Sequence, residues 1–398
     1  MPSIYIVGTS DTKAAELCYL RDVLRSAGCQ TVSIDVGTTS AGCEMDIPAT
    51  EIAALHPEGP DAVLGGNDRG EAVSAMGEAF ALFCRARKDQ IAGIIGIGGG
   101  GGTSMVCTGL RELPYGVPKV MVSTLASGDV APYVGISDII MVPSVTDLAG
   151  LNRLSRHILH NAAHAVLGMA GHLYQPPTES KPSIGLTMFG VTTPCLTKVV
   201  QSLDDQFDCV VFHATGSGGR SMEQLLRDGI LTGLIDITTT EIADELVGGV
   251  LSAGPERLDV LAKHPVPYVG SVGALDMVNF WAPETVPDKF PDRQFYHHNP
   301  NVTLMRVAED ESARIGRWIG NKLNRCDGPI RLLLPEKGIS ALDIEGGPFW
   351  NPASNAALFE ALHATVQQND RRRIMNVPHH INDPAFSAAV VETYLEII

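Results

Sequence analysis

The sequence has few positive charges for its length. It contains 29 lysine and arginine residues against 45 aspartate and glutamate residues, which gives a formal net charge of −16 at pH 7. A surface this acidic repels the phosphodiester backbone, so nucleic acid is excluded as a general partner. A single nucleotide is not excluded, because a local cluster of backbone N–H groups can bind phosphate inside an acidic protein.

Signals of membrane and secreted proteins are also missing. No apolar run of 18 residues is free of polar interruption, so no membrane span is expected. The segment 1–5 lacks a basic region followed by an apolar one, and it does not resemble a signal peptide. None of the eight cysteines forms a Cys-x-x-Cys pair, which is typical of reduced thiols in a cytoplasmic protein.

The apolar pattern indicates two α/β domains. A strand over 4–7, a helix over 14–27 and a strand over 31–34 follow one another with short connections, as in a parallel sheet. A proline-rich polar segment over 173–182 then interrupts the pattern. We predict two doubly wound, Rossmann-like parallel-sheet domains: a nucleotide-binding domain over 1–172 and a second, substrate-binding domain over 183–398.

Further elements follow from the same pattern. In the first domain it predicts helices over 69–87, 103–113 and 147–169, with strands over 92–95, 119–122 and 138–142. In the second domain it predicts strands over 183–188, 209–212, 233–236, 266–269, 302–305, 331–334 and 374–377.

A glycine run, Gly96–Thr103, lies between a predicted strand and a predicted helix. Glycine lets the backbone turn sharply and approach a ligand, and amides at a helix start attract anions. The match to G-x-G-x-x-G is weak, no lysine completes a Walker A loop, and a purely structural turn is the alternative. The candidate phosphate ligands are Gly98, Gly99, Gly100, Gly101, Gly102 and Thr103.

Polar residues also follow the first two strands. Thr9, Ser10, Asp11 and Lys13 could contact phosphate, although Ser10 or Asp11 could equally cap the next helix. Asp35 and Gly37 follow the second strand, where dinucleotide folds place the acid that holds a ribose hydroxyl.

Two later strand ends add hydroxyls and carboxylates. Ser123, Thr124 and Ser127 are further candidates for contact with the cofactor. Asp129 and Asp147 could ligate a Mg²⁺ ion held by phosphates, and Asp147 could instead cap the helix expected after it.

Several of these motifs occur together in one known family. The chain resembles the family of the N-terminal ATP-binding region of the plant tobamovirus-resistance protein. The resemblance covers the whole chain and implies two α/β domains, ATP bound in the first domain, and a homodimer. It places ATP at the Gly96–Thr103 loop and the neighbouring strand ends, and it implies no settled reaction. The motifs are Gly8–Lys13, Asp35–Gly37, Gly96–Thr103, Ser123–Asp129, Thr187–Pro194, His213–Gly219 and His380–Pro384.

The second domain has histidines and carboxylates at its predicted strand ends. Such residues could perform general acid–base catalysis or bind a metal, while helix caps and turns are the alternative. The loop His213–Gly219 offers a second backbone site for an anion. The candidate catalytic residues are His213, Glu223, Asp236, Glu241, Asp343, His380 and Asp383.

Two other groups of histidines occur in the sequence. His297 and His298 are adjacent, so on an extended chain they point to opposite faces and at most one faces a given pocket. His157, His160 and His164 share one helical face, which favours a half-buried or dimer-contact stripe over a metal triad.

These features support three hypotheses. The first is an ATP-dependent enzyme that acts on a small molecule in the interdomain cleft. The second is a nucleotide-responsive binding protein without turnover, which a scattered arrangement of the second-domain residues would favour. The third, an NAD-type oxidoreductase, is disfavoured because the loop after the first strand lacks the glycine fingerprint.

Overall fold

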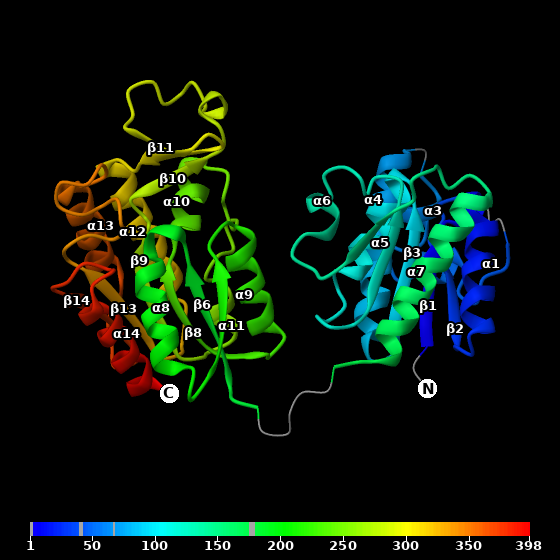
Figure 1. The fold of residues 1–398 in the computed structure, drawn as a ribbon, viewed down its shortest axis with the longest axis horizontal. Helices are drawn as coiled ribbons and strands as arrows, with labels where there is room; N and C mark the ends of the chain where they lie inside the picture. The colour runs from blue at the N-terminus through cyan, green and yellow to red at the C-terminus, as the bar shows by residue number, and fades with distance from the viewer. Residues whose placement is uncertain (1–2, 40–42, 67, 175–179) are drawn as a thin grey trace. The chain divides into compact units, whose positions relative to one another are not determined.

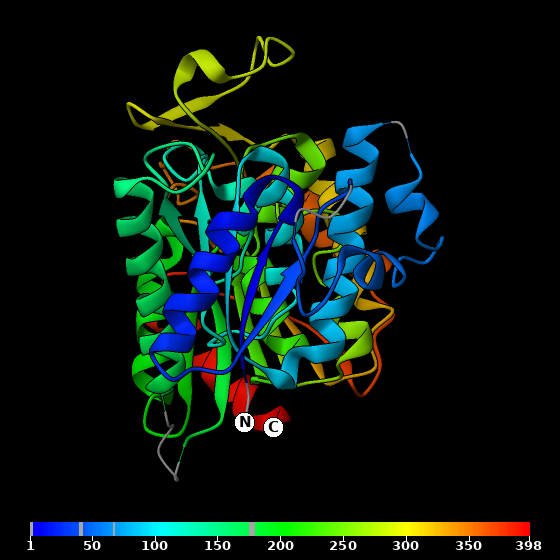
Figure 2. The same cartoon turned by 90° about the vertical axis from the view of Figure 1, so that its right-hand side faces the viewer.

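The chain forms two compact units, each built on its own parallel β-sheet (Figure 1 and Figure 2). The structure is a computed structural model that describes residues 3–39, 43–66, 68–174 and 180–398. The units comprise Met1–Pro176 and Pro177–Ile398, and part of the expected linker at 173–182 lies outside the described residues. The prediction of two parallel-sheet α/β domains is confirmed. No helix in the described ranges is long and apolar enough to cross a membrane.

The first unit contains a five-stranded sheet in the order β2-β1-β3-β4-β5, and all neighbouring strands are parallel. Its strands are β1 (Ser3–Gly8), β2 (Thr31–Asp35), β3 (Ile91–Gly98), β4 (Lys119–Ser123) and β5 (Ile140–Pro143). Its α-helices are α1 (Ser10–Ser26), α2 (Ala49–Ala53), α3 (Asp61–Leu64), α4 (Arg69–Arg87), α5 (Gly100–Leu110), α6 (Ala131–Val134) and α7 (Arg153–Gly171).

Alternation along the central strands gives this sheet two apolar faces. Ile4 and Ile6 of β1 pack with residues of α1 and α7, while Tyr5 and Val7 pack with residues of α4 and α5. Successive strand residues point to opposite faces, so a run of apolar residues needs helices on both sides. Figure 1 shows these two helical layers on either side of the sheet.

The strand order reverses between β1 and β3. The chain passes from β1 outward to β2 and then returns to the other side of β1 to form β3. Connections that leave in opposite directions open a crevice at the carboxyl ends of the two strands, which is where parallel α/β sheets bind ligands.

The second unit repeats this order in a six-stranded parallel sheet, β14-β13-β9-β8-β6-β7, which reverses between β6 and β8. Its strands are β6 (Ser183–Met188), β7 (Asp208–His213), β8 (Leu231–Thr238), β9 (Tyr268–Gly273), β13 (Ile330–Pro335) and β14 (Arg372–Val377). Its α-helices are α8 (Thr193–Leu203), α9 (Ser217–Arg227), α10 (Thr240–Val247), α11 (Val260–Lys263), α12 (Glu309–Leu323), α13 (Pro352–Thr365) and α14 (Pro384–Ile397).

A small antiparallel sheet was not predicted. The expected strand at 302–305 is β12 (Val302–Arg306), which pairs with β10 (Met277–Phe280) and β11 (Phe295–Asn299). These strands lie outside the parallel sheet, and Figure 2 shows the yellow β11 segment extending from the body of its domain. The sequence identified one strand of this sheet but could not show its partners, because strand pairing depends on tertiary contacts.

The predicted start of the helix at Asp147 was wrong. Helix α7 begins at Arg153, and the Asn152 side chain accepts hydrogen bonds from the amides of Leu154 and Ser155, each at 2.9 Å. Ser155 Oγ in turn accepts from the Asn152 amide at 2.8 Å, which completes a capping box. Asp147 therefore caps no helix.

Two glycines in helices give a test of the packing between layers. A Cβ on Gly109 of α5 would lie 2.3 Å from a ring carbon of Phe80, whereas a Cβ on Gly168 of α7 meets nothing within 4 Å. We expect Gly109→Ala to lower the free energy of unfolding by about 1–3 kcal/mol through overpacking. Gly168→Ala should raise it by roughly 0.5–1 kcal/mol. Urea denaturation of both variants measures the difference, and equal effects would contradict the packing described.

Candidate functional site

The glycine run is divided between a strand and a helix. Gly98 ends β3, Gly99 precedes the helix, and α5 begins at Gly100. A Cβ on Gly98 would lie 2.6 Å from the Thr103 nitrogen, so the close turn requires glycine there. The first backbone hydrogen bond of α5 runs from the Thr103 amide to the Gly99 carbonyl at 2.8 Å. The amides of residues 100–102 therefore have no acceptor within the helix.

Packing does not explain the glycines at 100, 101 and 102. The nearest atoms to an added Cβ would lie at 3.8 Å for Gly100, 3.5 Å for Gly101 and 3.6 Å for Gly102, which are ordinary van der Waals contacts. Glycine inside a helix costs about 1 kcal/mol relative to alanine. What these glycines provide is an uncovered backbone, which a ligand can approach closely.

A cavity of about 500 Å³ lies next to this uncovered backbone. It occupies the crevice at the carboxyl ends of β1, β2 and β3, where the strand order reverses. The first turns of α1, α4 and α5 all contribute to its wall. Asp68 caps α4 by accepting from the amides of Gly70 and Glu71, whereas α5 has no side-chain cap. The wall includes Thr9, Asp11, Thr12, Lys13, Thr38, Thr39, Asp68, Arg69, Val73, Gly99, Gly100, Gly101, Gly102 and Met105.

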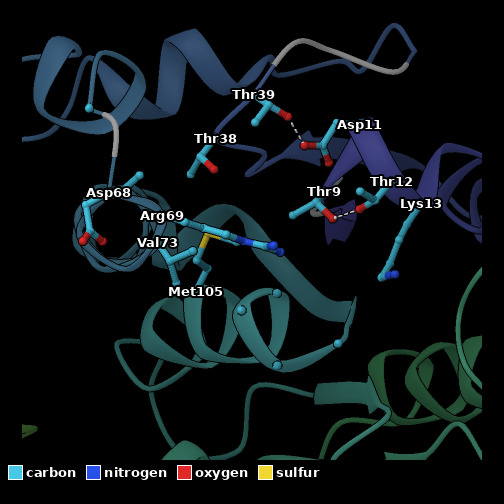
Figure 3. A pocket seen from close by; sticks show the side chains of 16 residues that line it. Thr9, Asp11, Thr12, Lys13, Thr38, Thr39, Asp68, Arg69, Val73 and Met105 are labelled. Atoms are coloured by element: carbon cyan, nitrogen blue, oxygen red, sulfur yellow. Dashed lines mark hydrogen bonds between the residues drawn. The ribbon is translucent and has the colours of Figure 1, made fainter.

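Two cations and two carboxylates line the cavity. Figure 3 shows the Arg69 side chain extending from α4 across the space toward Thr9. In the described ranges Arg69 forms no ion pair with a carboxylate, while Lys13 Nζ donates to the Leu148 carbonyl at 2.8 Å. Asp11 accepts a hydrogen bond from Thr39 Oγ1, but its buried Oδ1 receives none from any described residue.

Asp35 lies in the interior and not in the cavity wall. It is 2% exposed, and its Oδ1 accepts from the amides of Ser10 at 2.9 Å and Gly37 at 2.8 Å. Its Oδ2 accepts from Ser10 Oγ at 2.6 Å. With both oxygens engaged, Asp35 and its partners Ser10 and Gly37 fix the ends of β1 and β2, which positions the cavity-lining residues beside them.

Thr103 and Ser123 also have an internal role. Their hydroxyls lie 2.7 Å apart and both side chains are buried, which joins the start of α5 to the end of β4. Ser123 Oγ accepts from the Leu125 amide at 3.0 Å. Thr124 is half-buried and Ser127 is exposed, and neither belongs to the cavity wall.

The two aspartates predicted to bind Mg²⁺ lie outside the cavity wall. Asp129 Oδ1 accepts from the Ala131 amide at 3.0 Å at the start of α6, and Asp147 is exposed. Within the described ranges no cluster of three or more His, Cys, Asp or Glu side chains could hold a metal ion. The stripe of His157, His160 and His164 is exposed on α7, which excludes the half-buried alternative and leaves the dimer contact a prediction.

In the second domain three predicted catalytic residues surround a buried arginine. Arg257 donates to Glu223 at 2.9 Å, to Asp236 at 2.8 Å and to Glu241 at 3.1 Å, and all four residues are at most 3% exposed. Burial raises the pKa of the Glu223 carboxyl, and the Arg257 guanidinium opposes this shift. Arg257 is not predicted from the sequence, because nothing in its local sequence distinguishes a buried arginine from a surface one.

Glu241 also occupies the anion site that the His213–Gly219 loop was expected to offer. Its Oε1 accepts from the amides of Gly216 at 2.7 Å and Gly219 at 3.0 Å. The loop does bind an anion, but that anion is a side chain of the protein itself.

A second group contains Asp343, His380 and Asp383. Asp343 is buried, and its Oδ2 accepts from the Ile339 amide at 2.9 Å and from Asn355 Nδ2 at 2.7 Å. The His380 ring bonds the Ser340 carbonyl through Nε2 at 2.9 Å, and its Nδ1 accepts from the Asn382 amide at 3.1 Å. Asp383 accepts from the His380 amide at 3.0 Å. These contacts connect the loops after β13 and β14.

His213 lies apart from both groups. It is exposed at the end of β7, its ring centroid is 5.3 Å from that of Phe189, and it lines a second cavity together with His298. His297 lines a different cavity, in agreement with the expectation that at most one of these adjacent histidines faces a given pocket. The predicted catalytic set is therefore spread over three places.

Comparison with known proteins identifies a family. Residues 2–175 match the N-terminal domain, and residues 181–398 the C-terminal domain, of the Uncharacterised protein family (UPF0261). The chain belongs to the UPF0261 family. A UPF0261 protein of Rhizobium meliloti (strain 1021) is 61% identical over 397 residues, covering 100% of this chain and 99% of that protein.

Two other relatives are also similar to this chain over nearly its whole length. A UPF0261 protein of Clostridium tetani is 43% identical and covers 99% of this chain and 98% of its own length. The ToMV resistance protein Tm-1(GCR237) of Solanum lycopersicum is 39% identical over 100% of this chain, which spans 56% of that longer protein. The family predicted from the sequence motifs is thus confirmed, while the ATP associated with it remains a prediction.

The Arg257 cluster should be essential for stability. Arg257→Met would leave three buried carboxylates without their guanidinium partner, and we expect the free energy of unfolding to fall by about 3–5 kcal/mol. Glu241→Gln keeps an oxygen that can accept from the Gly216 and Gly219 amides, so it should lower the free energy of unfolding by less than Arg257→Met does. Chemical denaturation compares the free energies of unfolding of the two variants. An unchanged free energy of unfolding in Arg257→Met would contradict the pairing described.

Asp276 makes stability depend on pH. Its Oδ2 accepts from Ser340 Oγ at 2.8 Å, and burial raises its pKa to about 7, against about 3.9 in an unfolded chain. The proton is held more tightly in the folded state, so this contribution is complete below pH 4 and is lost as pH rises to 7. Relative to Asp276→Asn, wild-type stability should fall over this window by at most about 1.4 kcal/mol per pH unit. Urea denaturation at several pH values measures this, and a constant difference would contradict it.

Proposed function

We propose that the first domain binds a nucleotide through its phosphates, with ATP as the candidate ligand. The observation that carries the proposal is the run Gly100–Gly102, which exposes backbone amides to a cavity although packing does not require glycine there. An uncapped helix start combines N–H donors with the positive end of the helix dipole, which is a suitable environment for phosphate.

The charges of the cavity support the same ligand. Arg69 and Lys13 lie in the wall, and Arg69 has no carboxylate partner in the described part of the chain. Guanidinium groups bind phosphate oxygens with strong, charge-assisted hydrogen bonds. The hydroxyls of Thr9 and Thr12, which bond each other at 2.7 Å, could contact the ribose or a phosphate.

The choice of ATP comes from the family resemblance, since the cavity itself only favours a phosphorylated ligand. For Mg²⁺, the carboxylate in the wall with an unsatisfied buried oxygen is Asp11. Hard cations prefer carboxylate oxygens and usually bridge them to substrate phosphates. We therefore propose Asp11 as the metal-facing residue in place of Asp129 and Asp147.

The arrangement of the second domain favours nucleotide-responsive binding over turnover. Glu223, Asp236 and Glu241 are paired with Arg257, and Asp343 and His380 are bonded to neighbouring loops. Groups held in interior pairs are not available to transfer protons to a substrate. An ATP-dependent enzyme remains the second proposal, and its catalytic groups would then come from the cavity of the first domain.

Calorimetric titration with ATP, with and without Mg²⁺, tests this proposal. We expect Gly100→Val to abolish binding, because its branched side chain would cover the amides of α5. Arg69→Ala should weaken binding about tenfold, the usual effect of losing one hydrogen bond to a charged group. NAD should bind less tightly than ATP.

A matched arginine on the same helix provides the control. Arg85 of α4 pairs with Glu112 outside the cavity wall, so Arg85→Ala should leave ATP affinity unchanged. Circular dichroism checks that each variant is folded. No binding of ATP to the wild-type protein at millimolar concentration, or equal binding by wild type and Gly100→Val, would overturn the proposal.

A further inference from the structure

Two exposed histidines lie side by side on helix α7. His160 and His164 are four residues apart, so their side chains leave the same face of the helix one turn apart. Their ring centroids are 4.5 Å apart, with an angle of 55° between the ring planes. In the described ranges neither ring forms a hydrogen bond or an ion pair. Both imidazoles are therefore available to a ligand from solution.

The backbone under this pair is held in place. Leu159 and Ala163, which directly precede the two histidines, are fully buried in the core. Tyr19 of α1 donates a hydrogen bond to the Arg156 carbonyl at 3.3 Å, which joins α1 to the turn of α7 before His160. Because the helix is fixed by these contacts, a ligand that bonds both rings does not have to order the backbone.

The separation of the two rings suits a shared metal ion. A transition-metal ion such as zinc lies about 2.0–2.1 Å from each imidazole nitrogen that binds it. Two imidazoles that bind one ion at an angle of roughly 90–110° then have ring centroids about 4.5–5 Å apart. The observed separation of 4.5 Å is within this range. Zinc proteases use the same spacing of two histidines on one face of a helix.

The surroundings of the pair favour a cation. A shallow hollow of about 400 Å³ between α1 and α7 is lined by both histidines and by Asp22, which is the charged residue among those that line it. Asp22 lies 3.6 Å from Arg21 in an ion pair, but its side chain is 71% exposed and accessible to water. Arg156 does not line the hollow, since its guanidinium lies over the Tyr19 ring, 5.2 Å from the centroid.

The third histidine of the stripe does not join the pair. His157 lies outside the wall of the hollow, and of the three only His160 and His164 have their rings in contact. The site therefore offers two protein ligands, which agrees with the absence of a cluster of three or more ligands from the described ranges. Two protein ligands leave the other coordination positions of a metal ion to water.

We propose that His160 and His164 together bind one divalent transition-metal ion, such as Ni²⁺, Cu²⁺ or Zn²⁺, with water completing its coordination. Imidazole nitrogen is a preferred ligand of these ions, whereas Mg²⁺ and Ca²⁺ prefer oxygen. The inference does not depend on the nucleotide proposed for the first domain, because neither histidine belongs to the wall of the first cavity.

Calorimetric titration of the protein with Ni²⁺, without an affinity tag or nucleotide, tests the site. Ni²⁺ is the probe because thiols compete more strongly for Zn²⁺. His160→Ala and His164→Ala should each weaken binding roughly a hundredfold, because binding by the first imidazole makes binding by the second intramolecular. No binding of Ni²⁺ to the wild-type protein at millimolar concentration, or unchanged affinity in either variant, would overturn the proposal.

Two further variants separate shared binding from the number of histidines. His157→Ala removes an exposed histidine of the same helix that lies outside the hollow, and it should bind Ni²⁺ as the wild type does. Combining His164→Ala with Ala165→His keeps the number of histidines but moves one to an exposed position about 100° around the helix. This combination should bind as weakly as His164→Ala alone. Circular dichroism checks that each variant is folded. Wild-type affinity in the combined variant, or a loss in His157→Ala equal to that in His160→Ala, would overturn the proposal.

Discussion

The reversal of strand order is the constraint on which the rest of the structure depends. In each domain the first strand lies between the second and the third, so the loops that follow the first and third strands leave toward opposite faces of the sheet. Space opens at this point without any gap in the core, because the helices still cover both faces. The first cavity occupies this position in the first sheet, and the second cavity adjoins it in the second sheet.

The two domains use the same topology for different chemistry. In the first domain the wall has cations, hydroxyls and bare amides, whereas in the second domain it has aromatic rings and, among its described residues, no lysine, arginine, aspartate or glutamate. The difference arises where the small antiparallel sheet is added to the second domain, because β10 brings Asn279 and Phe280 to the wall. A shared fold thus sets where a cavity lies, and the attached segments set which side chains line it.

Buried carboxylates account for several residues that the sequence predicted to bind the cofactor or to act in catalysis. Asp35 holds loop amides, Glu241 fills a helix N-terminus, and Asp236 pairs with Arg257. Each of these groups is as buried as the apolar core, so each must be satisfied by donors from distant segments. The sequence therefore does not distinguish the two roles of an acidic residue at a strand end, since the same position suits a ligand contact or an internal hydrogen bond or ion pair.

Local pattern predicted much of the fold and part of the site. Alternation and helical spacing, which act over a few residues, gave helix α4 and the strands of both parallel sheets close to their observed bounds. The glycine run was placed correctly at a strand end, with Thr9, Asp11 and Lys13 beside it in the same wall. Arg69 was missed, because its helix precedes β3 and only the folded chain brings its first turn to that edge.

The sequence by itself determined the two domains, the parallel sheets and the sheet edge at which the first cavity lies, because these follow from periodicity and from the geometry of parallel strands. Only the tertiary structure decided which polar residues face a cavity and which are buried and paired in the interior. Pairing such as that of Arg257 with Glu223 joins residues far apart in the chain, and no local pattern encodes it. The buried Asp11 oxygen that receives no hydrogen bond from any described residue likewise becomes visible only after the nearby donors have been placed.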